Sequence, residues 1–134
     1  MSRIKTRELV MIQIYQMNIH NDYKFYPSIE KTIAAKIHDG REIKYAMQIF
    51  KEFTNNKEKI DDLIIDFSEN WDIDRIAKVD LAIIRLSITE MFFSKSVPES
   101  ISINEAINLS KKFSDEDSYK FINGLLGKIV RSKQ

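Results

Sequence analysis

The sequence predicts an all-α fold, and three observations support that prediction. The chain has 134 residues but only three glycines and two prolines, so few residues interrupt helices. Apolar residues recur at spacings of three, four and seven, as on one face of a helix. No segment of useful length alternates apolar and polar residues, which argues against strands. We therefore expect a single compact domain, residues 1–134, of about seven helices.

The first helix is expected to begin at Ser2, which can cap it, and to run to about Ile19. An apolar stripe predicts its buried face. That stripe consists of Ile4, Met11, Ile12, Tyr15 and Ile19. A polar and aromatic segment follows. Pro27 then suits the first turn of a second helix, because the N–H that proline lacks is not needed there.

Two more helices are expected before residue 70. The turn pair Asp39-Gly40 ends the second helix, and Asp39 with Glu42 forms a variant of the capping box that starts the third. Asn55-Asn56 is expected to interrupt the helical run between the third and fourth helices. A fourth helix then ends near Phe67, with apolar residues on one face and acidic residues on the other.

The second half of the chain is expected to contain the central helix. A short helix around residues 74–78 precedes the run Val79–Phe93, which is apolar nearly all round. A helix of that kind is normally buried on every side. Two capping boxes of one design follow. Ser102 with Glu105 predicts the start of the next helix, and Ser114 with Asp117 predicts the start of the last.

Composition excludes several classes of function. The chain has no cysteine, which excludes disulfides, Cys-ligated zinc and thiol catalysis. Its two histidines do not have metal-site spacing, and no Gly-rich phosphate loop or serine nucleophile motif is present. We therefore expect no enzyme activity, no cofactor and no metal. The apolar run Leu9–Ile14 is too short for a membrane span, so a soluble, cytoplasmic protein without membrane contact is expected.

The net charge of +1 conceals an uneven distribution. Residues 1–7 and 119–134 contain basic residues and no acid, whereas residues 58–74 contain seven carboxylates and one lysine. If the two ends of the chain lie together, they form a basic patch that could bind nucleic acid. The alternative is that these charged faces are simply solvated.

The individual candidates each have a structural alternative. Arg3 and Arg7 share a helix face and could meet an external anion, or could belong to a solvated terminus. Phe121 follows Lys120, so the ring could stack on an unpaired base or pack in the core. Asp117 and Ser118 could bind base edges or cap the last helix. A glycine inside that helix, Gly124, usually permits close approach of another helix, and less often of a ligand.

Three blocks of residues together resemble one family. The first comprises Arg3, Arg7, Gln13 and Tyr15-Gln16. The second comprises Trp71, Arg75-Ile76, Val79-Asp80, Ala82-Ile83-Ile84-Arg85 and Glu90. The third comprises Pro98, Ile103-Asn104-Glu105-Ala106, Lys111-Lys112-Phe113, Asp117-Ser118 and Lys120-Phe121-Ile122-Asn123-Gly124. In this order and spacing they resemble the NusB family of bacterial transcription antitermination factors.

The resemblance implies two small helical bundles and a role in binding RNA and protein. It implies binding of the boxA element of ribosomal RNA transcripts, and pairing with the ribosomal protein NusE to keep RNA polymerase processive. The RNA-binding residues implied, with Lys5 added from its place in the basic N-terminus, are Arg3, Lys5, Arg7, Asp117, Ser118, Lys120 and Phe121. NusE is expected along the middle helices, at Asp61, Asp62 and Asp80. An N-terminal cluster less rich in arginine than in many members implies weaker, more salt-sensitive RNA binding.

Two rival functions remain open at this point. One is a helical protein–protein adaptor without RNA affinity. The other is a detached RNA-binding domain of the kind found at the N-terminus of some RNA cytosine methyltransferases. The second rival lacks a cofactor-binding domain, since 134 residues leave no room for one.

Overall fold

The computed structural model describes residues 2–69 and 72–133. These residues form six α-helices, a short 3₁₀ helix and a π-helical segment, with no strand among them. The helices are α1 (Ser2–His20), α2 (Pro27–Ala34), α3 (Gly40–Phe67), η1 (Ile73–Arg75), α4 (Lys78–Ile88), η2 (Thr89–Phe93), α5 (Glu99–Phe113) and α6 (Ser118–Ser132). The all-α prediction is confirmed. Trp71, part of the second family block, lies outside the described residues.

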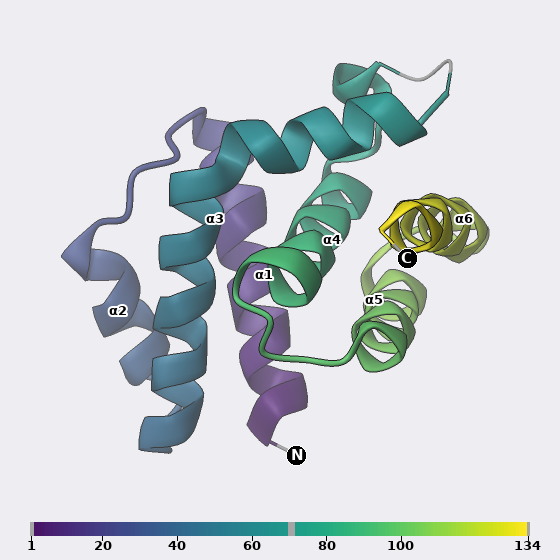
Figure 1. Ribbon diagram of the computed structural model, residues 1–134. Coiled ribbons are helices and arrows are strands. Elements are labelled where there is room, and N and C mark those ends of the chain that lie inside the picture. Colours follow the sequence, from purple (N-terminus) through teal and green to yellow (C-terminus); the bar gives the residue numbers. More distant parts are fainter. Residues whose placement is uncertain (1, 70–71, 134) are drawn as a thin grey trace.

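The helices form two groups that share a core. Figure 1 shows α1, α2 and the first part of α3 on one side, and α4, α5 and α6 on the other. α1 packs against α4, and α3 reaches both α4 and α6, so the groups are joined. One cluster of buried apolar residues extends through all six α-helices. No helix among the described residues is both long and apolar enough to span a bilayer.

The buried face of α1 differs from the predicted one. Ile4, Ile12 and Ile19 are 55%, 40% and 45% exposed, so three members of the predicted stripe face outward. Met11 is buried as predicted, and the core also receives Val10, Ile14 and Met17. α1 is apolar on two adjacent faces. Contact with both α3 and α4 selects the face that also carries the polar residues Thr6 and Arg7.

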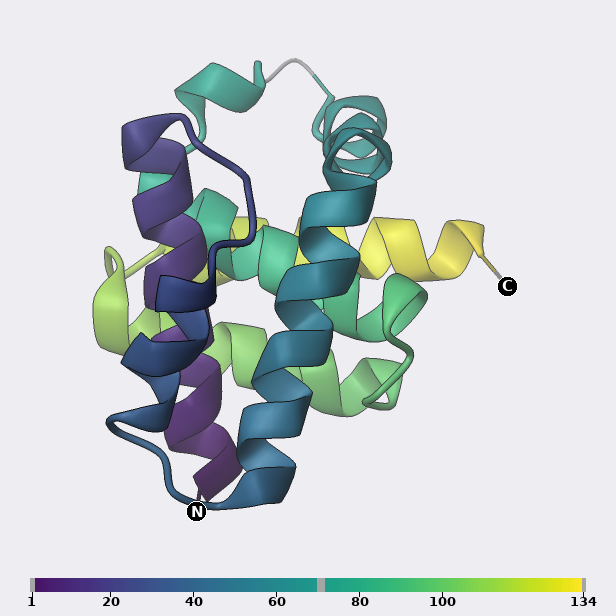
Figure 2. The same cartoon turned by 90° about the vertical axis from the view of Figure 1, so that its left-hand side faces the viewer.

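The expected break at Asn55-Asn56 is a kink inside one helix, α3. Asn56 has non-helical torsions, φ −123° and ψ 17°. Its side-chain amide donates to the carbonyl oxygen of Glu52 at 2.8 Å. A side chain bonded into the helical ladder in this way bends a helix without ending it. Figures 1 and 2 show the second part of α3 turned sharply away from the first.

The central helix is confirmed, while the end of α2 and the capping of α3 agree only in part with the predictions. Every residue from Asp80 to Met91 is buried. α2 ends at Ala34, several residues before the expected turn. Asp39 does cap α3 by accepting a bond from the backbone N–H of Arg41 at 2.9 Å. Glu42 does not complete the capping box, because its carboxylate binds Arg3.

Both capping boxes predicted in the second half are wrong. α5 begins three residues before Ser102, and the Ser102 hydroxyl donates to Glu90 at 2.9 Å. The Ser114 hydroxyl donates to Asp80 at 2.5 Å instead of capping α6. The cause is the same in both places. A buried carboxylate of the central helical segment needs hydrogen-bond donors, and a nearby serine supplies one.

Candidate functional site

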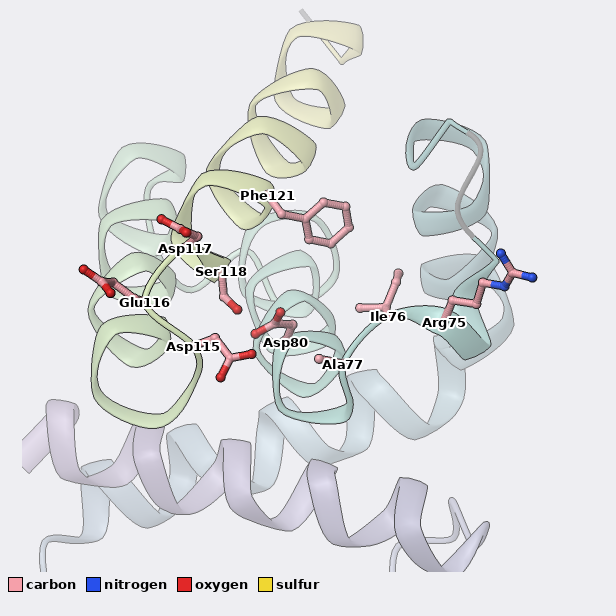
Figure 3. Close-up of a pocket in the computed structure, with 9 residues that line it drawn as sticks. All are labelled: Arg75, Ile76, Ala77, Asp80, Asp115, Glu116, Asp117, Ser118 and Phe121. Carbon is pink, nitrogen blue, oxygen red and sulfur yellow. The ribbon is translucent and has the colours of Figure 1, made fainter.

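An open groove lies where the start of α6 faces the start of α4. It has a volume of about 560 Å³ and holds four of the residues singled out from the sequence (Figure 3). Its lining residues are Arg75, Ile76, Ala77, Asp80, Asp115, Glu116, Asp117, Ser118 and Phe121. The structure therefore brings Asp117, Ser118 and Phe121 together with Asp80, although the sequence places Asp80 nearly 40 residues away.

The two sides of the groove differ in character. In Figure 3 the Phe121 ring extends toward Ile76, while Asp115, Glu116 and Asp117 lie on the opposite side. Phe121 is half-buried and packs against the core while its ring also lines the groove. Phe121 therefore belongs both to the edge of the core and to the lining of the groove.

A chain of hydroxyl groups fixes the α5–α6 turn to α4. Asp80 accepts from the Ser114 hydroxyl at 2.5 Å, and the hydroxyl oxygens of Ser114 and Ser118 lie 3.0 Å apart. Asp80 itself is only 6% exposed. Asp80, where the resemblance placed a NusE contact, therefore has little surface to offer a partner. Its carboxylate holds the groove together.

The N-terminal basic residues occupy three different environments. Lys5 is exposed. Arg3 is half-buried, donates to Glu42 at 2.8 Å and lies 3.9 Å from the centre of the Tyr45 ring. Arg7 was expected to be exposed at a helix end, and that expectation is wrong, because it is 3% exposed.

Arg7 is the centre of a buried polar network. Its Nε and Nη2 donate to one oxygen of Glu90 at 3.0 and 2.9 Å, and Tyr45 donates to the same oxygen at 2.5 Å. Glu105 lies 3.5 Å from Arg7 Nη1. Burial lowers the pKa of Arg7, but Tyr45 and Glu90 outweigh it, and the net pKa is raised. Burial, followed by Glu90, raises the pKa of Tyr45 well above its ordinary value.

The basic patch predicted at joined chain ends does not form. Figures 1 and 2 both place the two ends of the chain well apart. The N-terminal arginines are also neutralised by Glu42 and Glu90, which lie far along the chain. α6 retains an outward basic face of its own. It carries Lys120, Lys128 and Arg131.

The acidic segment is only partly available to a partner. Asp61 is buried and accepts two hydrogen bonds from Arg85, both at 3.0 Å, so it has little surface to offer the NusE contact expected there. Asp62 is exposed. It borders a second open groove of about 390 Å³ between α3, η2 and the end of α6. The other residues lining that groove are Lys59, Leu63, Asp66, Phe92, Phe93 and Lys133.

Sequence signals were weak or misleading for three features near this site. Arg75 and Ile76 line the Phe121 groove, and only their place in the second family block pointed to them. Glu90 was visible as an isolated acid in an apolar helix, a pattern that signals a buried partner. Gly124 was expected to allow tight helix packing, which is wrong, because a side-chain carbon there would meet no atom within 4 Å. The described residues contain no group of three or more potential metal ligands.

Comparisons with known proteins point to one family. The NusB family model matches residues 4–131. A transcription antitermination protein NusB of Acetivibrio thermocellus is 41% identical over 133 residues, which are 99% of this chain and 91% of that protein. The structure of T. maritima NusB superposes with a TM-score of 0.83 at 28% identity, over 96% of this chain and 90% of that one.

A third similar protein was solved as a complex. It is described as a crystal structure of antitermination factors NusB and NusE with double-stranded RNA. Its TM-score is 0.85 at 24% identity, and the match covers 98% of this chain and 97% of that one. At that identity the similarity demonstrates a common fold and nothing further.

Proposed function

This chain belongs to the NusB family, and we propose that it acts as a transcription antitermination factor. In this proposal residues 1–134 form one domain that binds boxA-type single-stranded RNA of ribosomal RNA transcripts. The domain pairs with NusE and thereby helps RNA polymerase remain processive, in the cytoplasm. The match to a non-enzymatic antitermination protein over 91% of its length supports this function over a detached methyltransferase domain.

The structural observation that carries the RNA-binding part is the open groove beside Phe121. An aromatic ring that lines a groove offers a platform for an unpaired base. Lys120 is the neighbouring cation, and its side chain is 67% exposed, so it can meet a phosphate. Asp117 and Ser118 can bond base edges, since carboxylates accept hydrogen bonds from groups such as the cytosine amino group.

The acidic side of the groove determines which side of the bound strand faces the protein. Asp115 and Glu116 repel phosphates, so the sugar–phosphate chain runs past Lys120, which balances the charge of Asp117, and the bases face the groove. Lys5 and the exposed part of Arg3 are proposed to contact RNA as well. Arg7 is proposed to serve RNA binding indirectly, by anchoring α1 through Glu90.

The partner-binding part of the proposal rests on the exposed acids of the second part of α3. Asp62 and Asp66 lie one turn apart beside the second groove. Their charge would steer a basic ribosomal protein toward this surface. The capture of a NusB of the same fold with NusE and RNA supports the choice of NusE as the partner.

The experiment that tests the RNA site is Phe121→Ala, with Phe25→Ala as a matched control. Phe25 is a partly exposed aromatic outside the groove, packed against Phe50. Loss of one base stack should cost about 1–3 kcal/mol of affinity for a boxA-like single strand. Unchanged affinity in Phe121→Ala, with a loss of folding stability alone, would make this residue part of the core and remove the stacking role.

A further inference from the structure

We propose that the bound RNA strand continues beyond the Phe121 groove along the outward face of α6. On this path Lys120, Lys128 and Arg131 contact successive phosphates. The inference rests on the proposed function and specifies the course of the strand. It would extend the contact by about 16 Å, the helical rise over the 11 residue steps from Lys120 to Arg131.

The side chains of α6 divide cleanly between two faces. Ile122, Leu125, Leu126 and Ile129 are buried against the rest of the molecule. Lys120, Gly124, Gly127 and Arg131 follow one another at spacings of four, three and four, so they share the opposite face. Phe121, Gly124 and Lys128 form the adjoining row at spacings of three and four. The groove residue Phe121 is thus continuous with this face.

The charge of this face suits a phosphate chain. Residues 119–134 contain no acid. Lys120 is 3.5 Å from Asp117, but both side chains are largely exposed, and ion pairs of that kind are weak enough for a phosphate to compete. Lys128 contacts Glu69 at the end of α3. Arg131 is exposed and folds back along the helix toward Gly127.

The middle of the face is open to close approach. Gly124 lies inside a helix, where glycine lowers helix stability relative to alanine. Space around its α-carbon is unoccupied, so packing against another helix does not require a glycine here. With no side chain at this position, an external chain can lie against the helix backbone between the flanking cations.

RNA fits this face better than a protein partner does. Stable protein interfaces need an apolar centre. None of the large apolar side chains that are exposed in the described part of the chain lies on α6. The face has cations at both ends and continues a groove that offers an aromatic ring, which together match a single strand of nucleic acid.

The test compares a short single strand that fills only the groove with one extended by several nucleotides. Wild-type protein should bind the extended strand more tightly. Arg131→Glu should weaken binding of the extended strand by about fivefold or more at low salt and leave the short strand unaffected. Arg131→Gln should lower the salt slope for the extended strand by about 0.7.

Lys133 provides the matched control. It lies at the same end of α6, but its ammonium group is 5.8 Å from the centre of the Phe92 ring, on another side of the helix. Lys133→Glu makes the same change of charge and should leave both affinities unchanged. Gly124→Gln should raise folding stability and weaken binding of the extended strand alone. A loss of binding without a loss of stability means that the new side chain obstructs the RNA and that the protein is still folded.

Each outcome decides between the claims. Equal wild-type affinity for the two strands overturns the α6 path while the groove and the proposed function stand. Equal losses of affinity for the extended strand in Arg131→Glu and Lys133→Glu also overturn it, because the effect is then a general electrostatic attraction between protein and RNA. If the wild-type protein binds neither strand, the proposed RNA-binding function fails and this inference fails with it.

Discussion

Replacing Arg7 should destabilise the fold, although the sequence suggested an exposed RNA-binding residue whose replacement would affect folding little. Arg7→Ala leaves the buried carboxylate of Glu90 without its cation. Breaking a buried ion pair in this way costs about 3–5 kcal/mol. Tyr45 and Ser102 still donate to Glu90, so we expect a value near 3 kcal/mol. With a urea slope of about 1.5 kcal/mol/M, the unfolding midpoint should fall by about 2 M.

Urea unfolding followed by circular dichroism measures this loss, and Lys5→Ala is the matched control. Lys5 is an exposed cation on the same turn of α1, so its removal should change stability by less than about 0.5 kcal/mol. Adding Glu90→Leu to Arg7→Met should recover part of the loss, because the uncompensated charge is then absent. A shift in Arg7→Ala no larger than in Lys5→Ala would refute the assignment of Arg7 as a buried anchor.

Three other predictions follow from individual contacts. The pKa of Tyr45 is raised in the folded protein, so its contribution to stability is complete below the ordinary tyrosine pKa and is lost as pH rises through the folded pKa. Tyr45→Phe should therefore reduce the fall in stability above about pH 10. An unchanged fall in stability at alkaline pH would contradict this. Gly124→Ala should raise the unfolding free energy by about 1 kcal/mol in thermal melts, and destabilisation would mean that the glycine is needed for packing. Reversing Asp62 and Asp66 to Lys should slow association with NusE in stopped-flow measurements, with an effect that shrinks as salt rises; loss of RNA binding with unchanged NusE association would place the two surfaces the other way round.

Features set by helical periodicity and composition were predictable from the sequence. The run Val79–Phe93 is apolar nearly all round, and the structure buries every residue from Asp80 to Met91. Asn55-Asn56 correctly located a change of direction, although the chain bends there and stays helical. The candidate RNA-binding residues Asp117, Ser118 and Phe121 line one groove, because they are neighbours at the start of one helix.

Features that depend on distant partners were not predictable. Ser102 and Ser114 have the local pattern of helix caps, yet each donates its hydroxyl hydrogen bond to a buried carboxylate of the central helical segment. The basic start of the chain looked free of acid. Arg3 pairs with Glu42, 39 residues later in the sequence, and Arg7 pairs with Glu90, 83 residues later. Local patterns report backbone preference, whereas the pairing of buried charges is decided by which helices pack together.

The measurement that tests the central claim most directly is a titration of the wild-type protein with a boxA-like single strand, with and without NusE. We expect saturable, salt-sensitive binding by the protein alone, with a slope of about −0.7 per phosphate contact, and tighter binding when NusE is present. A strand of scrambled sequence should bind more weakly. No binding in either condition, with NusE association intact, would contradict the account and identify the protein as an adaptor without RNA affinity.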